Sequence, residues 1–522
     1  MTERVAGVTG ARALVETAAA AGVEVCFANP GTTEMPLVTA LDEVSALRPV
    51  LGLFEGVCTG AADGYARLAG KPAMTLLHLG PGFANGIANL HNARRANSPV
   101  LNVVGDHSSW HLPYDAPLAS DIVSLATPVS GWVGTVDSAA RTSQVTVEAL
   151  AAAMTPPCCG ATLIVPADFQ QATVTEPLAA VPPPQTPAPF ATGRVERTAK
   201  RLRDGSRSVL LLGAETLTAR GQRAAQRISE ATGAKLYSET FPATAERGGG
   251  LPDLDRLPYF PEAAVKALAD AESVVLAGAK EPVAYFGYAG VPSLLAEPGS
   301  VQILAEPGED GVGALEELAE ALGATNASTR RREPDIQDGL PDGPLAPASI
   351  GRIVSALLPE NAVVSVEGGT CGYPFFTASA YAARHTTLTN TGGAIGQGLP
   401  AALGAAVAAP ERQVIALQSD GSAQYTIQAL WTMAREQADV VTLIASNRRY
   451  GILRTELNRH GGSAGGPASA SLTSLDDPPL NWPALAAGYG VPGQRAETGD
   501  ELARALRQAL AAGGPQLIEM VL

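Results

Sequence analysis

The stretch "SDGSAQYTIQALWTMAREQADVVTLIASN", Ser419 to Asn447, decides the fold of the last third of the chain. It begins where the apolar run "QVIALQ" ends and finishes where the next run, "DVVTLIA", ends. Two short runs rich in Val, Ile and Leu with a helical pattern between them are typical of consecutive strands in a buried parallel sheet. Because parallel strands end at one edge of the sheet, we expect Asp420 and Asn447 to converge there.

Small polar groups at such an edge favour a metal and a phosphate group. A carboxylate oxygen, an amide oxygen and a nearby backbone carbonyl form a hard oxygen set that suits Mg²⁺, which commonly bridges to phosphates. The amides of a helix predicted to begin near Ser422 would receive an anion. The alternative is that Asp420 is only a helix N-cap and Asn447 only a turn former. Their joint placement after consecutive strands favours a diphosphate clamp with a metal.

The rest of the chain repeats the alternation of apolar runs and Ala-rich helical patterns, which predicts an α/β fold of doubly wound parallel sheets. Its 522 residues exceed what one core usually serves. Two proline-rich segments, "EPLAAVPPPQTPAPFATG" and "TNASTRRREPDIQDGLPDGPLAPAS", are predicted linkers. We therefore predict three doubly wound parallel-sheet domains, over residues 1–180, 192–326 and 345–522.

Composition excludes several classes of function. The formal net charge is −15, and no long basic run could follow a phosphate backbone, so a nucleic-acid partner is not expected. The five cysteines show neither paired zinc-ligand spacing nor a disulfide framework. The N-terminal segment lacks the layout of a signal peptide, and no apolar run is long enough to span a bilayer. We expect a cytoplasmic protein without a membrane partner.

The opening stretch resembles the cofactor motif of the thiamine diphosphate-dependent enzymes, usually written GDG and, farther on, NN. Asp420, Gly421 and Asn447 keep the pattern, whereas Ser419 and Ser446 depart from it. The segments "FANPGTTEMPLVTALD", "LFEGVCTGAADGYARLAGKPA", "LLHLGPG" and "LTNTGGAIGQGLPAALG" also resemble benzoylformate decarboxylases and acetolactate synthase large subunits, most closely actinobacterial acetolactate synthase-like proteins.

This resemblance implies three catalytic residues: Glu55, His78 and Thr32. Glu55 would hydrogen-bond the aminopyrimidine ring of the cofactor and promote loss of the thiazolium C2 proton. Independently of the family, a glutamate directly after the apolar run "VLGLF" is costly unless it is paired or protonated, although it could also be an exposed strand-end residue. His78 would act as general acid or base, unless it is structural. Thr32 stands where benzoylformate decarboxylase has a catalytic serine.

The resemblance also implies the residues that hold the cofactor. Glycines in "NTGGAIGQGLP" and "VEGGTCG" would let backbone approach it closely, although either segment could be a plain turn. Gly369 and Thr370 would hold the diphosphate, and Ile395 would bend the cofactor. The complete cofactor set is Gly369, Thr370, Gly393, Ala394, Ile395, Gly421, Ser422 and Tyr450. The implied Mg²⁺ ligands are Asp420, Asn447 and the backbone carbonyl of Arg449.

The implied reaction is decarboxylation of a 2-oxo acid, after which the enamine is protonated or joined to an aldehyde or a second 2-oxo acid. The family implies a homodimer or homotetramer with active sites at the subunit interface, Glu55 coming from one chain and Asp420 and Asn447 from the other. Phe286 falls where the decarboxylase has a second histidine, which favours carboligation.

Three further residues carry hypotheses about this reaction. His107 could serve as a second proton donor. His91 is expected on a helix at a subunit surface. Glu456 falls where the decarboxylase has an aromatic wall and would suit a polar or cationic acceptor, unless it lies on a solvated helix face.

Other functions stay open at this point. A catalytically degenerate family member acting as a binding or regulatory subunit would explain Ser419, Ser446 and Phe286. An acetolactate synthase containing FAD is a further alternative, but no phosphate-gripping sequence is evident in the middle segment and we expect no FAD. A nicotinamide or flavin oxidoreductase should show G-x-G-x-x-G after an early strand, whereas "GGAIGQG" has the wrong spacing.

Overall fold

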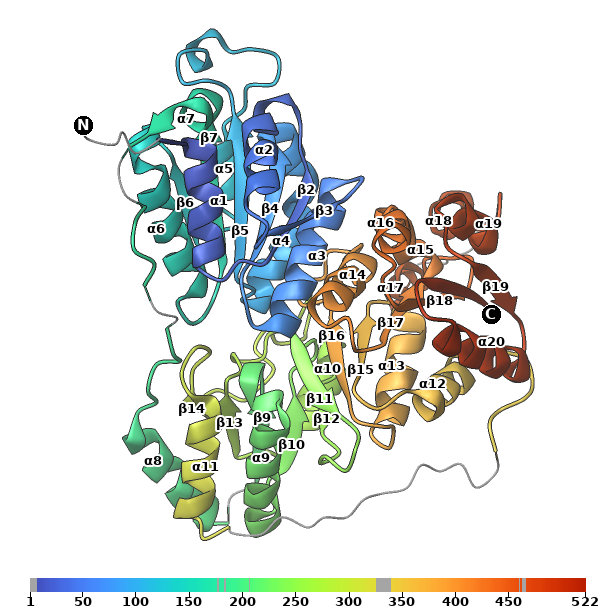
Figure 1. Cartoon of the computed structure of the whole chain (residues 1–522). Helices are drawn as coiled ribbons and strands as arrows, with labels where there is room; N and C mark the ends of the chain where they lie inside the picture. Colours follow the sequence, from blue (N-terminus) through green and yellow to red (C-terminus); the bar gives the residue numbers. More distant parts are fainter. Residues whose placement is uncertain are drawn as a thin grey trace.

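Three helix-flanked sheets form the framework of the chain, as the computed structural model shows (Figure 1). The structure describes residues 7–175, 178–182, 185–205, 207–324, 339–459, 461 and 466–522. The predicted α/β class is confirmed. Most of the second predicted linker lies outside the described residues, as does the expected boundary at residue 326. The domain boundaries stay a prediction.

The first sheet is parallel throughout, as the buried apolar runs predicted. Its spatial order is β3 (Arg48–Leu51), β2 (Val25–Asn29), β4 (Ala73–His78), β5 (Val100–Asp106), β7 (Gly160–Pro166) and β6 (Trp132–Thr135). One face packs on α1 (Gly10–Ala20), α2 (Met35–Glu43) and α6 (Thr142–Met154). The other packs on α3 (Glu55–Ala69), α4 (Leu79–Ala96) and α5 (Ile122–Ala126). Short α7 (Ala167–Gln171) and the pair β1 (Val8–Thr9) and β8 (Thr173–Val174) complete this part.

The second sheet is also parallel, in the order β12 (Asp255–Arg256), β10 (Lys235–Ser238), β9 (Ser208–Leu212), β13 (Ser273–Ala277) and β14 (Val301–Ala305). Helices α8 (Thr192–Arg203), α9 (Ala219–Thr232) and α11 (Gly311–Ala321) share one apolar cluster with it, and α10 (Pro261–Leu268) belongs to a second cluster. The sheet therefore has packed helices on both faces.

The third sheet departs from the expected all-parallel pattern. Its order is β11 (Thr244–Arg247), β16 (His385–Thr389), β15 (Ala362–Val366), β17 (Val414–Ser419), β18 (Val440–Ser446), β20 (Gln516–Val521) and β19 (Gly493–Ala496). The edge strand β11 comes from the middle segment and runs antiparallel to β16. The sequence did not reveal this strand, because the polar run "TAER" has no apolar alternation.

Two groups of helices cover the third sheet. Helices α12 (Pro347–Leu357), α13 (Gly369–Ser379) and α20 (Gly499–Ala512) pack on one face. The other face packs on α14 (Gly398–Ala408), α16 (Ala429–Glu436) and α19 (Trp482–Gly488). Three further helices, α15 (Asp420–Ala423), α17 (Gly451–Arg459) and α18 (Pro467–Thr473), follow strand ends and loops. Among the helices of the described ranges, none is long and apolar enough to cross a membrane.

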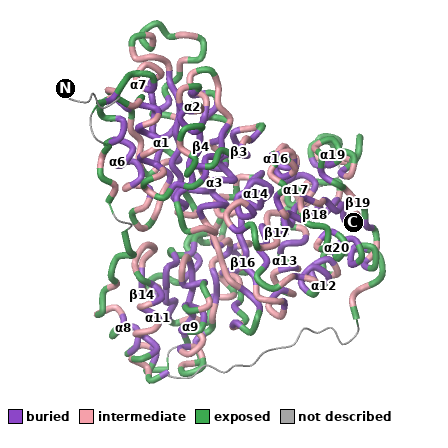
Figure 2. The backbone as a smooth tube through the Cα atoms, in the orientation of Figure 1, coloured by how far each residue is buried: buried purple, intermediate pink, exposed green. Residues whose placement is uncertain are grey.

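Helices α3 and α14 join the first and third sheets into one apolar core. Every residue of α3 from Glu55 to Ala66 is buried, and Figure 2 shows the two helices meeting in the buried interior. Backbone contact requires glycine on both sides of this pair. A Cβ at Gly64 would lie 2.3 Å from the carbonyl oxygen of Ala401, and one at Gly404 would lie 1.9 Å from that of Ala61. These positions fix the first sheet against the third.

Candidate cofactor site

The opening stretch forms the strand–helix–strand unit that its pattern predicts, with one difference at the turn. Helix α15 begins at Asp420 rather than near Ser422. Ser419 is the N-cap, in extended conformation, and its N–H donates to Oγ of Ser422 at 3.2 Å. Asp420 is therefore not the cap that the alternative interpretation assumed. The contact uses the backbone N–H of Ser419, so the serine side chain is not needed for the cap.

The carboxylate of Asp420 ties together the ends of β17 and β18. Its Oδ1 accepts the N–H of Gly421 at 2.9 Å and its Oδ2 accepts the N–H of Arg448 at 2.5 Å. The residue is only 2% exposed, and this burial raises the pKa of Asp420 above its ordinary value against the effect of both N–H groups. An anionic oxygen pair held at this edge is suited to a cation.

Asn447 and Thr370 meet at the edge where Asp420 lies, because they follow β18 and β15, the strands on either side of β17. Nδ2 of Asn447 donates to Oγ1 of Thr370 at 3.1 Å, and Oγ of Ser419 lies 3.5 Å from the same oxygen. The N-termini of α13 and α15 thus come together at one edge. Gly369, the first residue of α13, is exposed, and a Cβ there would meet nothing within 4 Å. Free space at a helix N-terminus suits a diphosphate.

The predicted metal ligands already have hydrogen-bond donors. Oδ1 of Asn447 accepts the N–H of Arg449 at 3.1 Å, and the carbonyl of Arg449 accepts the N–H of Gly451 at 3.0 Å. Each oxygen keeps a second lone pair, so the donor set fits Mg²⁺. Across the described ranges, no group of three or more His, Cys, Asp and Glu residues could hold a metal. The predicted set contains one carboxylate only and stays a prediction.

Two other predicted cofactor residues shape the turn. A Cβ at Gly421 would lie 2.6 Å from Cε1 of Tyr450, so the ring of Tyr450 packs on the glycine backbone. The hydroxyl of Ser422 donates to Oε1 of Gln418 at 3.0 Å. Ser422 therefore stabilises the turn, and its role toward a cofactor remains a prediction.

The segment from Asn390 to Gln397, which we call the glycine loop, is arranged around a carboxylate that the sequence analysis missed. Oε1 of Glu367 accepts the N–H groups of Gly396 at 2.7 Å and Gln397 at 3.0 Å, and Oε2 accepts that of Gly398 at 2.9 Å. Asn390 adds a donor to Oε1 at 3.2 Å. The signal was available, because Glu367 directly follows a buried strand.

Some of the glycine-loop residues that are predicted to contact the cofactor are open to solvent. A Cβ at Gly393 would meet nothing within 4 Å, and Ile395 is 43% exposed. Gly396 has φ of +106°, and a Cβ there would lie 2.7 Å from Cβ of Tyr425, so glycine is required. Gly393 and Ala394 stay predicted contacts of the aminopyrimidine ring, and Ile395 stays the residue predicted to bend the cofactor.

Glu55 and His78 lie together at the carboxyl edge of the first sheet. Glu55 is the first residue of α3, is 8% exposed, and accepts Nδ2 of Asn85 at Oε2 at 3.0 Å. A Cβ at Gly82 would lie 3.1 Å from Oε1 of Glu55 and 3.4 Å from Cβ of His78. The exposed strand-end interpretation of Glu55 is therefore wrong.

A second missed carboxylate, Glu34, anchors His78. Oε2 of Glu34 lies 2.7 Å from Nδ1 of His78 and accepts the N–H of Gly31 at 2.8 Å. Glu34 is fully buried, so the pair fixes the ring of His78. Thr32 begins the same 3-10 turn, Thr32–Glu34, and is exposed. Glu34 could have been suspected as an acidic residue within the matched motif "NPGTTEMP".

The other histidines have different surroundings. His107 follows β5, and its buried Nε2 has no hydrogen-bond partner in the described part of the chain. His91 is on α4 as expected, but its Nε2 lies 3.1 Å from the carbonyl oxygen of Gly392, so its ring contacts the glycine loop of the same chain. The expectation that His91 lies at a subunit surface stays a prediction.

Phe286 and Glu456 lie near the junction of the middle segment and α17. Phe286 is 57% exposed, next to Tyr285, which stacks edge-on against Phe241. Oε1 of Glu456 accepts the hydroxyl of Tyr288 at 3.2 Å and lies 3.5 Å from Nε of Arg459. Arg459 also pairs with Glu262 at 2.7 Å, so its charge is shared, and the hypothesis that Glu456 suits a polar or cationic acceptor stays a prediction.

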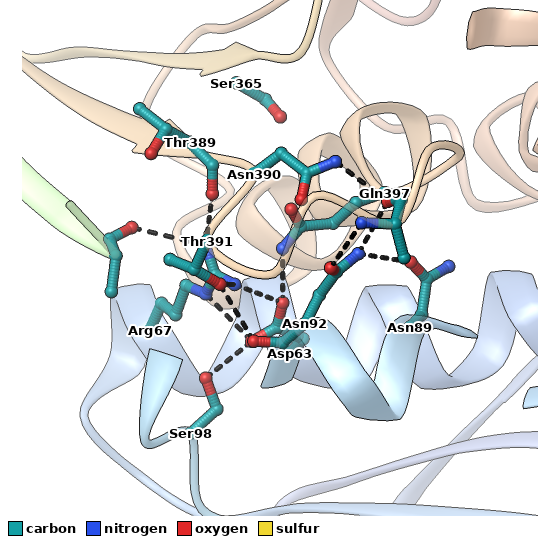
Figure 3. Close-up of polar contacts among 12 residues, drawn as sticks. Asp63, Arg67, Asn89, Asn92, Ser98, Ser365, Thr389, Asn390, Thr391 and Gln397 are labelled. Carbon is teal, nitrogen blue, oxygen red and sulfur yellow. Dashed lines mark hydrogen bonds and ion pairs between the residues drawn. The ribbon is translucent and has the colours of Figure 1, made fainter. Parts of the chain in front are cut away.

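The two halves of the predicted site do not meet within one chain. Among the contacts of the described residues, no hydrogen bond or ion pair links Glu55 or His78 with Asp420, Asn447 or Thr370. The first sheet instead contacts the glycine loop through the far half of α3 and through α4 (Figure 3).

Comparison with known proteins identifies relatives of the whole chain. The family model for the C-terminal TPP binding domain of thiamine pyrophosphate enzymes matches residues 369–520, and that for the N-terminal TPP binding domain matches residues 8–125. A Mycobacterium tuberculosis protein provisionally named acetolactate synthase large subunit IlvX is 49% identical over 517 residues, covering 98% of each chain.

Two further relatives have decarboxylase names. Benzoylformate decarboxylase from Pseudomonas aeruginosa is 31% identical over 530 residues, covering 96% of each chain. The solved structure of a thiamine diphosphate-dependent 4-hydroxybenzoylformate decarboxylase from Rhodococcus jostii RHA1 is similar with a TM-score of 0.85 and 26% identity, over 98% of this chain and 99% of that one.

Proposed function

The chain belongs to the thiamine pyrophosphate-dependent enzymes, and we propose that it is a Mg²⁺-dependent decarboxylase or carboligase of 2-oxo acids. The relatives named acetolactate synthase and benzoylformate decarboxylase support this class of substrate. The observation that carries the proposal is the cluster of Asp420, Asn447 and Thr370 at two helix N-termini, beside the open backbone of Gly369. That cluster has the chemistry of a metal and diphosphate clamp.

Each half of the site has a distinct task in this proposal. When bound, thiamine diphosphate supplies a nucleophilic carbon for the substrate carbonyl and an electron sink for the departure of CO₂. The third sheet would hold the diphosphate and Mg²⁺, and the glycine loop would orient the aminopyrimidine ring. Glu55, partly withdrawn from water, would hydrogen-bond the aminopyrimidine ring and promote loss of the thiazolium C2 proton.

His78 is the proton carrier of this proposal. Glu34 holds Nδ1 at 2.7 Å, which leaves Nε2 as the nitrogen that exchanges protons with substrate. With Phe286 in place of a second histidine, protonation has fewer donors. We therefore favour joining to a second carbonyl compound over release of an aldehyde.

Two copies of the chain are required by this proposal. Glu55 of one copy meets Asp420 and Asn447 of the other, since the described contacts within one chain leave these groups apart. The minimum assembly is a homodimer, and a homotetramer of two such dimers satisfies the same condition.

Calorimetric titration tests binding first. Thiamine diphosphate with Mg²⁺ should bind at micromolar concentration, and binding should weaken strongly when Mg²⁺ is replaced by a chelator. Pyruvate, benzoylformate and branched 2-oxo acids are then supplied with and without aldehydes, and products are identified by mass spectrometry. Absence of cofactor binding at high micromolar concentration would favour the degenerate, non-catalytic alternative.

A further inference from the structure

A buried polar junction joins α3 and α4 of the first sheet to the glycine loop of the same chain (Figure 3). Asp63 and Arg67 form its centre, with an ion-pair distance of 2.6 Å and side chains 0% and 2% exposed. The carboxylate of Asp63 also accepts Nε2 of Gln397 at 2.5 Å. Arg67 donates to the carbonyl oxygen of Thr389 at 2.7 Å and to Oγ1 of Thr391 at 3.1 Å. Both ends of the glycine loop are thus attached to α3.

Asn92 on α4 holds the middle of the same loop. Its Oδ1 accepts the N–H of Ala394 at 3.1 Å, and its Nδ2 donates to the carbonyl oxygen of Ala394 at 2.8 Å. Asn92 is fully buried, so this two-way contact is made away from water. The neighbouring Asn89 donates to the carbonyl oxygens of Gly56 and Gly396, at 2.7 and 3.3 Å. Backbone of the loop is therefore fixed from the first sheet, and not only by Glu367.

We propose that Asn92, supported by Asp63 and Arg67, is a positioning residue for the glycine loop of its own chain, so that the α3–α4 pair serves two cofactor sites at once. This inference rests on the proposed function, in which Glu55 acts at the site completed by the partner copy. Glu55 begins α3, and Asp63 lies about 12 Å farther along it at 1.5 Å per residue. The start of α3 then serves one cofactor, and its far half fixes the loop that receives the other.

Amide hydrogen exchange of the cofactor-free protein tests the contact directly. Asn92→Ala removes the acceptor of the Ala394 N–H, so exchange in the glycine loop should accelerate about tenfold, the effect of losing one to two buried hydrogen bonds. The dissociation constant of thiamine diphosphate should rise by a similar factor. At saturating cofactor, the rate of C2-proton exchange of the bound cofactor, followed by NMR after acid quench, should fall.

Asn102→Ala is the matched control. Asn102 is also a fully buried asparagine of the first sheet, but it bonds Thr75 and Thr162 instead of the loop. This control should lower thermal stability without changing loop exchange or cofactor affinity. Should Asn92→Ala not fold, Arg67→Lys keeps the charge beside Asp63 but cannot reach Thr389 and Thr391 together, and it should accelerate loop exchange at least threefold. Loop exchange and affinity within twofold of the parent protein would overturn the proposal.

Mixed dimers test whether the loop is held within its own chain. With Glu55→Gln on one chain and Asn92→Ala on the other, both defects fall in one site, and about half of the parent activity should remain. With both substitutions on one chain, each site has one defect, and activity at low cofactor concentration should be several-fold lower. Equal activity of the two arrangements would overturn the assignment. Full turnover by the Glu55→Gln homodimer would instead refute the proposed function, while loop exchange still decides the role of Asn92.

Discussion

Replacement of Glu367 by Gln should loosen the glycine loop from the side of the third sheet. The carboxylate of Glu367 accepts four N–H groups, from Gly396, Gln397, Gly398 and the side chain of Asn390. An amide has only one accepting oxygen. When the amide of the new glutamine is oriented so that its oxygen faces three of these donors, its NH₂ group faces the N–H of Gly398. That N–H then has no acceptor.

The magnitude follows from this geometry. A buried N–H without an acceptor costs about 1–3 kcal/mol. The three remaining bonds lose their charge assistance, which roughly doubles the strength of a hydrogen bond. Together these losses should lower the free energy of local opening by at least about 3 kcal/mol, equivalent to at least about a 100-fold change in an equilibrium constant at 1.36 kcal/mol per factor of ten.

Hydrogen exchange of residues 396–398, measured by mass spectrometry on the cofactor-free protein, should therefore be about 100-fold faster in Glu367→Gln. Glu360→Gln is the control, because Glu360 is exposed and accepts only the N–H of Arg384, at 3.2 Å, among the hydrogen bonds described for it. The control should leave the exchange of this segment unchanged. Exchange within threefold of the parent protein in Glu367→Gln would show that the carboxylate does not hold the loop.

Three further substitutions test other parts of the structure. Glu55→Gln should abolish turnover while thiamine diphosphate still binds, as measured by calorimetry; near-normal turnover would contradict the assigned role. Asp420→Ala should lose Mg²⁺-dependent retention of cofactor, and purification with a full complement would show that the clamp is misplaced. Burial raises the pKa of Glu239 to about 7, so the stability that its protonated form provides is complete below about 4.5 and is lost as pH rises through 7. Glu239→Gln should remove this loss of stability, which is worth roughly 2 kcal/mol after allowance for the partial exposure of the residue. The measurement is the denaturation midpoint of both proteins at pH 5 and at pH 8. An equal change in midpoint between the two pH values in the parent protein and the variant would contradict the prediction.

Local pattern was sufficient to predict the sheet edge at which the site lies. Asp420 and Asn447 each end an apolar run, and the rule that parallel strands end together brought them to one place. Ser419 and Ser446 illustrate why the cofactor motif is only partly kept. The hydroxyl of Ser419 lies 3.5 Å from Oγ1 of Thr370, and Ser446 is a buried strand residue whose carbonyl accepts the N–H of Leu522. Neither departure removes a group from the clamp.

Long-range partners were not predictable in the same way. Glu34, Glu367 and Asp63 bond groups whose positions depend on tertiary structure, such as Gln397, which is 334 residues from Asp63 in the chain. The i, i+4 spacing of Asp63 and Arg67 in an otherwise apolar helix did contain a signal, since two charges on a buried helix need each other. The spacing in the sequence indicates that Asp63 and Arg67 form an ion pair, but it does not show which other groups the pair contacts.

In the proposed dimer, the close packing of α3 and α14 accounts for one chain carrying halves of two different sites. Glycines at positions 64 and 404 bring the helix backbones into contact, and the junction of Asp63, Arg67 and Gln397 lies beside them. With the far half of α3 fixed against the third sheet of its own chain, its first residue, Glu55, has no described contact with the clamp of that chain. A rigid contact at this end of α3 therefore agrees with the proposal that Glu55 acts at the site of a second copy. Loosening this contact in one chain of the proposed dimer should disturb the cofactor site that the glycine loop of that chain completes.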